Sequence, residues 1–127
     1  MKQTTGKVPI EILVGAVESL TTIARNRSLR NVIVNSNTVD TACASFELTC
    51  PMMNDYKIAC CNAIAILCVD KIGRSAFLKA HGPRKLYNLL VDVKSIPVRN
   101  AAVQLIQLLC ADPSLADAFV QARYLNL

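Results

Sequence analysis

The chain has 127 residues, of which 53% are hydrophobic and only 5% aromatic, with no tryptophan, and its formal net charge is +5 at pH 7. At this length one continuous core is expected, built from aliphatic side chains and cysteines rather than from aromatic rings. Charged residues interrupt every apolar run before it reaches the roughly 20 residues that a membrane-spanning helix needs. We therefore expect no transmembrane segment. Because Glu11 and Glu18 fall within the first apolar stretch, we also expect no signal peptide.

Apolar residues at three- and four-residue spacing predict an amphipathic helix over residues 9–25. A short helix is expected over residues 29–35, followed by a polar segment, 35–37, whose asparagines tolerate left-handed backbone geometry. A third, less regular helix is predicted over residues 38–49, where the Cys50–Pro51 step ends it. Its inward-facing residues are expected to be Val39, Ala42, Cys43, Phe46 and Leu48.

Residues 58–69 contain one polar side chain, Asn62, so a helix here is predicted to be covered on nearly every side and to form the centre of the core. A short helix is expected over residues 73–80, and Pro83 opens the next one after the break at Gly82. Ser95 is the expected cap of a helix over residues 96–111. A last short helix is predicted over residues 114–122, and residues 124–127 are interpreted as the start of another.

The order long helix, short helix, medium helix therefore occurs more than once, and the copies can be put in register. An offset of 44 followed by one of 42 carries Leu20 to Ile64 and then to Ile106. The same offsets align six further apolar triples: Ala16/Cys60/Ala102, Val17/Cys61/Val103, Ile23/Leu67/Leu109, Ala24/Cys68/Cys110, Ile33/Phe77/Phe119 and Val34/Leu78/Val120. We expect a tail over residues 1–7 and one helical domain over 8–127, divided into units at about 8–51, 52–94 and 95–127.

Three of these features resemble the armadillo/HEAT class of helical repeat proteins. They are the unit length, the short helix followed by Ala80-His81-Gly82-Pro83, and the long-helix sequence NAAVQLIQLLC over residues 100–110. The resemblance covers nearly all of residues 8–127 and implies an all-α, right-handed α-solenoid fragment of about two and two-thirds repeats. One unit of this kind cannot bury its own apolar faces, so both ends of the stack are expected to expose apolar surface, as in a fragment of a longer array.

In this family the long helices line a concave surface, so the resemblance implies that polar residues on them bind the partner. The candidate partner-binding residues are Glu18, Thr21, Lys57, Asn62, Arg99, Asn100, Gln104 and Gln107. The alternative is that these are ordinary solvated positions on helices whose other faces are buried. Thr22, Ile66 and Leu108 stand where many peptide-binding armadillo proteins have asparagine, and the chain has no tryptophan. Importin-like recognition of a nuclear-localisation peptide is therefore not expected.

Basic residues gather near the short helices, and Arg30 and Arg74 are equivalent by the 44-residue offset. We expect a basic ridge formed by Arg30, Arg74, Lys79, Arg84 and Lys85. It could receive phosphates or an acidic protein segment, or it could be a solvated rim that keeps an apolar stack in solution. No aromatic residues are interleaved with these cations for base stacking, so nucleic-acid binding is the weaker interpretation.

The six cysteines are interpreted as reduced thiols rather than as a disulfide framework. Five of them lie in apolar helical runs and are expected to be buried, namely Cys43, Cys60, Cys61, Cys68 and Cys110. Cys50 precedes Pro51 and is expected to contact solvent. This usage favours an intracellular, cytoplasmic protein, with the nucleus left open. The chain has no C-x₂-C pair, only one histidine (His81) and no glycine-rich phosphate loop. We therefore expect no metal, no cofactor and no catalysis.

The leading functional interpretation is a non-catalytic protein-interaction scaffold or adaptor that binds a peptide or helix of another protein along its long-helix face. A second is self-association, or docking onto the rest of a larger cytoskeletal or signalling protein, through the exposed ends of the stack. A third is nucleic-acid binding by the basic ridge.

Overall fold

The computed structural model describes residues 9–125, and over this range every regular element is a helix. Residues 1–8 and 126–127 lie outside the described residues, and with them the predicted tail and the last two residues of the helix expected over 124–127. The described elements are α1 (Ile10–Ile23), α2 (Arg27–Val34), α3 (Thr38–Ser45), the short 3₁₀ helix η2 (Pro51–Met53), α4 (Asn54–Leu67), α5 (Lys71–Lys79), α6 (Gly82–Asp92), α7 (Ile96–Leu109) and α8 (Pro113–Leu125). The all-α fold class is confirmed.

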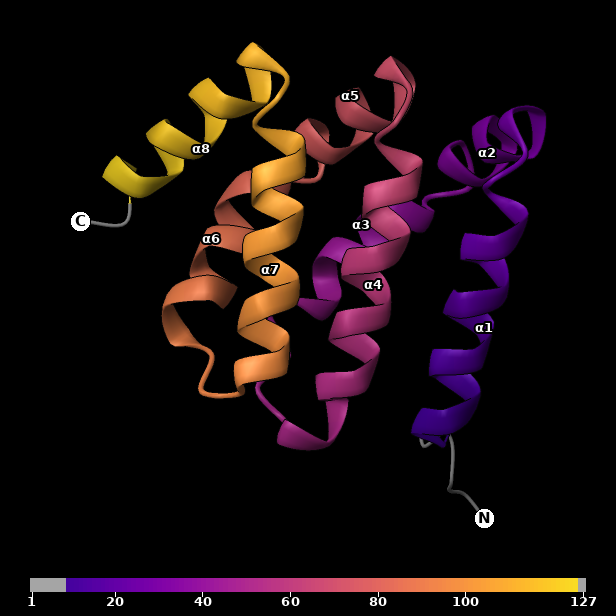
Figure 1. Ribbon diagram of the computed structural model, residues 1–127, viewed down its shortest axis with the longest axis horizontal. Helices are drawn as coiled ribbons and strands as arrows, with labels where there is room; N and C mark the ends of the chain where they lie inside the picture. Colours follow the sequence, from indigo (N-terminus) through magenta and orange to yellow (C-terminus); the bar gives the residue numbers. More distant parts are fainter. Residues whose placement is uncertain (1–8, 126–127) are drawn as a thin grey trace.

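The three helices of fourteen residues, α1, α4 and α7, lie side by side and run in the same direction (Figure 1). The middle one, α4, packs against α1 on one side and α7 on the other. Behind this row lie α3, which contacts α4, and α6, which contacts α7. The helices α2, α5 and α8 lie near the end of the row where the long helices finish, and α8 packs mainly on α6.

The core is centred on α4, as the sequence predicts. Its Ile64 side chain is completely buried, and Cys60, Cys61 and Leu67 are nearly so. Burying an aliphatic side chain of this size contributes about 1.5–3 kcal/mol, so α4 carries much of the apolar stabilisation. The burial of Phe77 and Phe119 extends this core into α5 and α8, where the two ring centroids are 6.3 Å apart.

Two predicted helix ends are wrong. The third helix stops at Ser45 rather than Thr49, because the amides of Phe46, Glu47 and Leu48 bond three residues back and close a tight turn. Leu48 consequently lies exposed and not in the core. The last helix does not end near residue 122, since α8 continues to Leu125, and no separate helix starts at residue 124.

Two non-glycine residues adopt left-handed backbone geometry among those described, and they lie 44 positions apart. Asn37 has φ 64° and precedes α3, whereas His81 has φ 58° and precedes α6. The prediction that the polar segment 35–37 tolerates such geometry is confirmed at Asn37. After His81, Gly82 meets the ring of Phe77 so closely that an added Cβ would lie 2.3 Å from it. A glycine is therefore required where the chain turns between α5 and α6.

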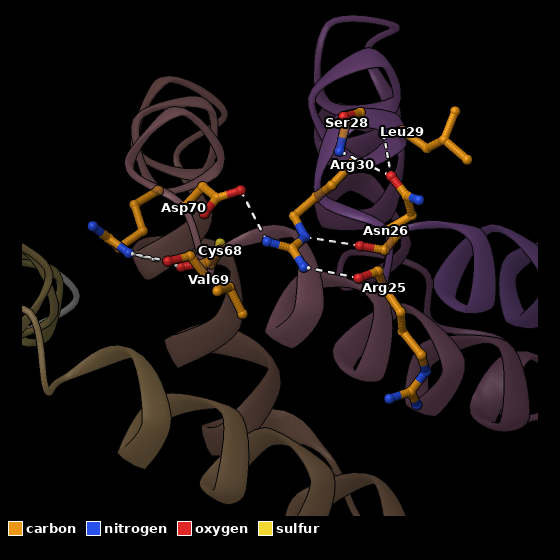
Figure 2. Close-up of polar contacts among 10 residues, drawn as sticks. Arg25, Asn26, Ser28, Leu29, Arg30, Cys68, Val69 and Asp70 are labelled. Carbon is orange, nitrogen blue, oxygen red and sulfur yellow. Dashed lines mark hydrogen bonds and ion pairs between the residues drawn. The ribbon is translucent and has the colours of Figure 1, made fainter.

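An arginine on α2 joins three helices (Figure 2). The Nε of Arg30 donates to the carbonyl oxygen of Ala24 at 2.8 Å, and its Nη2 donates to that of Arg25 at 3.3 Å. Its Nη1 forms an ion pair with Asp70, 2.9 Å from Oδ2. Because the last carbonyls of a helix lack intrahelical partners, the guanidinium caps the end of α1 while it binds the residue that begins α5.

A related arrangement occurs 44 residues later, on α5, although there the Nε of Arg74 forms an ion pair without a hydrogen bond. The Nη1 of Arg74 donates to the carbonyl oxygens of Cys68 and Val69, at 3.1 and 2.8 Å. Its Nε lies 2.8 Å from Oδ2 of Asp112, whose other oxygen accepts from the amide of Ser114 at the start of α8. We call these two sets of contacts the arginine clamps.

We expect Arg30→Ala to lower the free energy of unfolding by about 2 kcal/mol, because charge-assisted bonds are lost at a site where the arginine side chain is only 11% exposed. Arg30→Lys should recover only part of this, since an ammonium cannot form the same planar fork of bonds. Urea unfolding followed by circular dichroism measures both.

The matched control is Arg27→Ala, which removes an exposed arginine from the same helix. Its expected effect is within about 0.5 kcal/mol of the unchanged chain. Equal losses for Arg30→Ala and Arg27→Ala would show that the clamp contributes no specific stabilisation.

Candidate functional site

The candidate site is the face formed by α1, α4 and α7. Glu18, Asn62 and Gln104 occupy equivalent positions on these three neighbouring helices, and all three are exposed. We call them the polar row. Of the other predicted partner-binding residues on this face, Arg99, Asn100 and Gln107 are exposed, whereas Thr21 is half-buried. The hydroxyl of Thr21 donates to the carbonyl oxygen of Val17 at 2.8 Å, so its proton is already engaged.

An open cleft of about 400 Å³ runs between α1 and α4 on this face. Glu18, Thr21 and Asn62 line it, together with Ala59 and Ala65, whose small side chains leave the space. The structure therefore brings three of the predicted residues into one depression. It adds Arg25, which the sequence had not singled out for this face. Glu18 and Arg25 line the same cleft, so it presents both signs of charge next to an amide.

A second cleft, of about 430 Å³, lies between the ends of α4 and α7. Its lining is more apolar and includes Val69, Leu108 and Pro113, with Arg74 and Asp112 of the second clamp beside them. Gln104, Gln107, Arg99 and Asn100 line neither cleft. The polar row thus crosses three helices, but only its α1 and α4 members share a depression.

The prediction that Lys57 lies on this exposed face is wrong. Lys57 is only 6% exposed, and it lines a different cavity, at the end of the molecule where α4 and α7 begin. The equivalent residue on α7, Arg99, is exposed and its Nη2 donates to the carbonyl oxygen of Val93 at 3.1 Å. Equivalence in the sequence did not fix burial, because the segment after α3 and the end of α6 enclose Lys57 in a cavity that Arg99 does not line.

The basic ridge is largely engaged in contacts within the chain. Arg30 and Arg74 are the two clamp arginines, and Nζ of Lys85 lies 3.7 Å from Oε1 of Glu47. Lys79 and Arg84 remain as exposed cations. Nucleic-acid binding stays a prediction, but three of its five residues already have carboxylate partners.

An apolar pocket of about 170 Å³, which the sequence did not predict, lies beneath α1 where α2, α3 and α4 meet. Val17, Leu20 and Ile33 line it, with Tyr56 and Cys60 from α4. Burial, and then the neighbouring Cys60, raise the pKa of Tyr56 above its ordinary value. The phenol is consequently neutral and adds no charge to the pocket.

The cysteines are placed mostly as expected. Cys43, Cys60, Cys61 and Cys68 are buried and Cys50 is exposed, but Cys110 at the end of α7 is only half-buried. Desolvation raises the pKa of the Cys43, Cys61 and Cys68 thiols to about 12, so these groups stay protonated at neutral pH. A protonated, buried thiol is neither a nucleophile nor a metal ligand.

Within residues 9–125, no cluster of three histidine, cysteine or acidic side chains is arranged to hold a metal ion. Over the same range, no helix has the length and apolar character required to cross a membrane. Comparisons of the chain with protein-family models, with curated proteins and with solved structures return no match.

The thiols should react with Ellman's reagent in an order set by burial. At pH 8, Cys50 is expected to react rapidly and Cys110 more slowly, while the four buried thiols react only on unfolding. Burial raises the pKa of all four, to about 12 for Cys43, Cys61 and Cys68, and so suppresses the thiolate. Cys50→Ser should abolish the rapid phase. Rapid reaction of more than two thiols in the folded chain would contradict this order.

Proposed function

We propose that this chain is a non-catalytic interaction module of stacked, armadillo-like helical units that binds a peptide or helix of another protein across α1, α4 and α7. The observation that carries the proposal is the polar row, together with the open cleft between its first two members. Amide side chains such as Asn62 and Gln104 can both donate and accept hydrogen bonds, which suits an extended peptide backbone. The paired charges of Glu18 and Arg25 would add selectivity at one end.

The repeat interpretation is supported by features that recur at the offset seen in the sequence. The left-handed residues Asn37 and His81 are 44 positions apart, and so are the clamp arginines Arg30 and Arg74. The clamp aspartates, Asp70 and Asp112, are 42 apart. Six thiols without a disulfide suit a reducing compartment, and we propose the cytoplasm.

Replacing the polar row should weaken partner binding without unfolding the chain. We expect the triple variant Glu18→Ala, Asn62→Ala, Gln104→Ala to bind at least about tenfold more weakly to peptides selected on the unchanged protein from a random-sequence display library. Because the three side chains are exposed, the thermal unfolding curve should change little. Fluorescence anisotropy with a labelled peptide measures the affinity.

The control is Gln121→Ala, which removes an exposed glutamine from α8, outside the three long helices. It is expected to bind the peptide with unchanged affinity. If the triple variant also binds unchanged, peptide recognition across this face is excluded.

A second candidate function is docking through the outer side of α1, and a specific observation favours it. We define the outer stripe as Ile12, Ala16, Ser19 and Ile23, which follow one another at helical spacing. The positions equivalent to Ile23 are Leu67 on α4 and Leu109 on α7, which are 1% and 3% exposed, whereas Ile23 itself is 45% exposed. Ile12 is 60% exposed, and its equivalent on α7, Val98, is fully buried. The stripe is thus uncovered on α1, although its equivalents are buried on α7 and, apart from the half-buried Tyr56, on α4.

The apolar surface continues onto α2 through Leu29 and Val32, which are also exposed. The occupant that fits is a further helical unit whose long helix lies along α1 as α1 lies along α4. A second copy of this chain stacked in the same sense fits less well. Its exposed α7 face would bring Arg99, Asn100 and Gln107 against the apolar stripe and bury their polar groups.

A further helical unit placed before α1 should slow the exchange of the backbone amide hydrogens of α1 with solvent. We expect that placing a copy of residues 10–53 directly before Ile10 slows amide hydrogen exchange in the original α1 by at least about tenfold, because the outer stripe becomes buried. Ile12→Asp with Ile23→Asp in the original α1 should abolish this protection. In the unextended chain the same pair should change stability little, since both residues are exposed.

Two results would contradict this second candidate. One is unchanged exchange in α1 of the extended chain. The other is dimerisation of the unextended chain, measured by sedimentation equilibrium, that the two aspartates abolish, since the stripe would then bind a second copy.

A further inference from the structure

Lys57 is the only charged residue among those described that is buried. The other buried polar residue, Ser45, is satisfied because its hydroxyl donates to the carbonyl oxygen of Ala42 at 2.6 Å. The side chain of Lys57 makes no hydrogen bond or ion pair with any residue in the described range. Its Nζ is not among the fully buried side-chain atoms that lack a partner, so the stem of Lys57 is buried while its ammonium reaches the cavity. A ligand in the cavity would supply the counter-charge that the described residues do not.

The cavity that Lys57 lines has the size of a small-molecule site. Its volume is about 560 Å³, and its walls come from the segment after α3, the first turn of α4, the end of α6 and the segment that leads into α7. Asn54, Asn88 and Ser95 add neutral hydrogen-bonding groups to the lining. Ligand sites usually combine such a concave, partly apolar enclosure with a few polar groups that fix the orientation of the ligand.

The electrostatics of the cavity favour an anion. Two helices of fourteen residues, α4 and α7, begin here, and the first-turn amides of a helix carry partial positive charge. Lys94 adds a second cation to the lining. Two carboxylates also line the cavity, but Asp92 is exposed, and the Glu47 side chain is 62% exposed and pairs with Lys85. The buried side of the cavity therefore carries the positive charge.

We propose that this cavity is a binding site for a small oxyanion-bearing ligand, either a phosphate or a carboxylate, with Lys57 as its charge partner. The compact ammonium of lysine suits a phosphate oxygen or a single carboxylate oxygen equally. The side-chain amides of Asn54 and Asn88 would donate to the remaining oxygens. The site lies at the end of the molecule where α4 and α7 begin and shares no residue with the polar row or its cleft. It therefore does not depend on the peptide-binding function proposed above.

The test is a titration of the full, ¹⁵N-labelled chain with inorganic phosphate, and separately with acetate, at constant ionic strength. We expect saturable shifts of amide resonances in the first turns of α4 and α7, with an affinity of about millimolar for a single ionic group. The anion that binds with the higher affinity shows whether the site prefers a phosphate or a carboxylate. Absence of saturable shifts with both anions would overturn the proposal.

Lys57→Met keeps the unbranched apolar stem and removes the ammonium, so it should weaken binding at least about tenfold without a loss of folding. Because the Lys57 ammonium has no partner in the described range and methionine keeps the buried stem, the unfolding temperature should change little. The matched control, Lys79→Met, removes an exposed lysine from α5 and should leave the titration unchanged. Equal binding by Lys57→Met and the unchanged chain would overturn the proposal. So would equal weakening by Lys57→Met and Lys79→Met, which would indicate a general charge effect.

Discussion

The arrangement depends on the burial of α4 between two helices that lie parallel to it. A helix with a single exposed polar residue in its second half cannot be stable in water alone, and α1 and α7 together remove its apolar sides from solvent. The outer helices, α1 and α7, are covered by another long helix on one side only. Each has one long-helix neighbour, and α1 has no fully buried residue within its length. The difference between middle and edge explains the exposed outer stripe.

Apolar contact sets which helices meet, and the arginine clamps define how they meet. Each clamp connects the carbonyl groups at the end of a long helix to the aspartate at the beginning of the next short helix. A guanidinium has five donors in a fixed plane, so it can satisfy two carbonyls and a carboxylate only in one relative orientation. The clamps use two of the three arginines that the sequence suggested for a basic ridge, and the surface loses that charge as a consequence.

The two proposed ligand-binding features differ in how they arise. The polar row results from exposed residues on three helices whose other sides are occupied by packing, so its chemistry is adaptable and suits another polypeptide. The Lys57 cavity results from a lysine whose stem is buried and whose ammonium has no partner among the described residues, and it suits a small group with opposite charge. The polar row requires the parallel alignment of α1, α4 and α7, whereas the Lys57 cavity requires that α4 and α7 begin at similar heights (Figure 1).

The sequence by itself determined that the chain is helical, where most helices begin, which residues form the centre of the core, and that Arg30 and Arg74 are equivalent. These properties follow from local periodicity, proline and glycine positions and internal spacing, which need no knowledge of neighbours. Only the tertiary structure decided that the two arginines bind Asp70 and Asp112, that Lys57 is buried while its equivalent Arg99 is exposed, and that Ile12 and Ile23 are uncovered. The reason is physical: periodicity identifies the apolar side of a helix, but burial and ion pairing depend on whether another helix lies against that side.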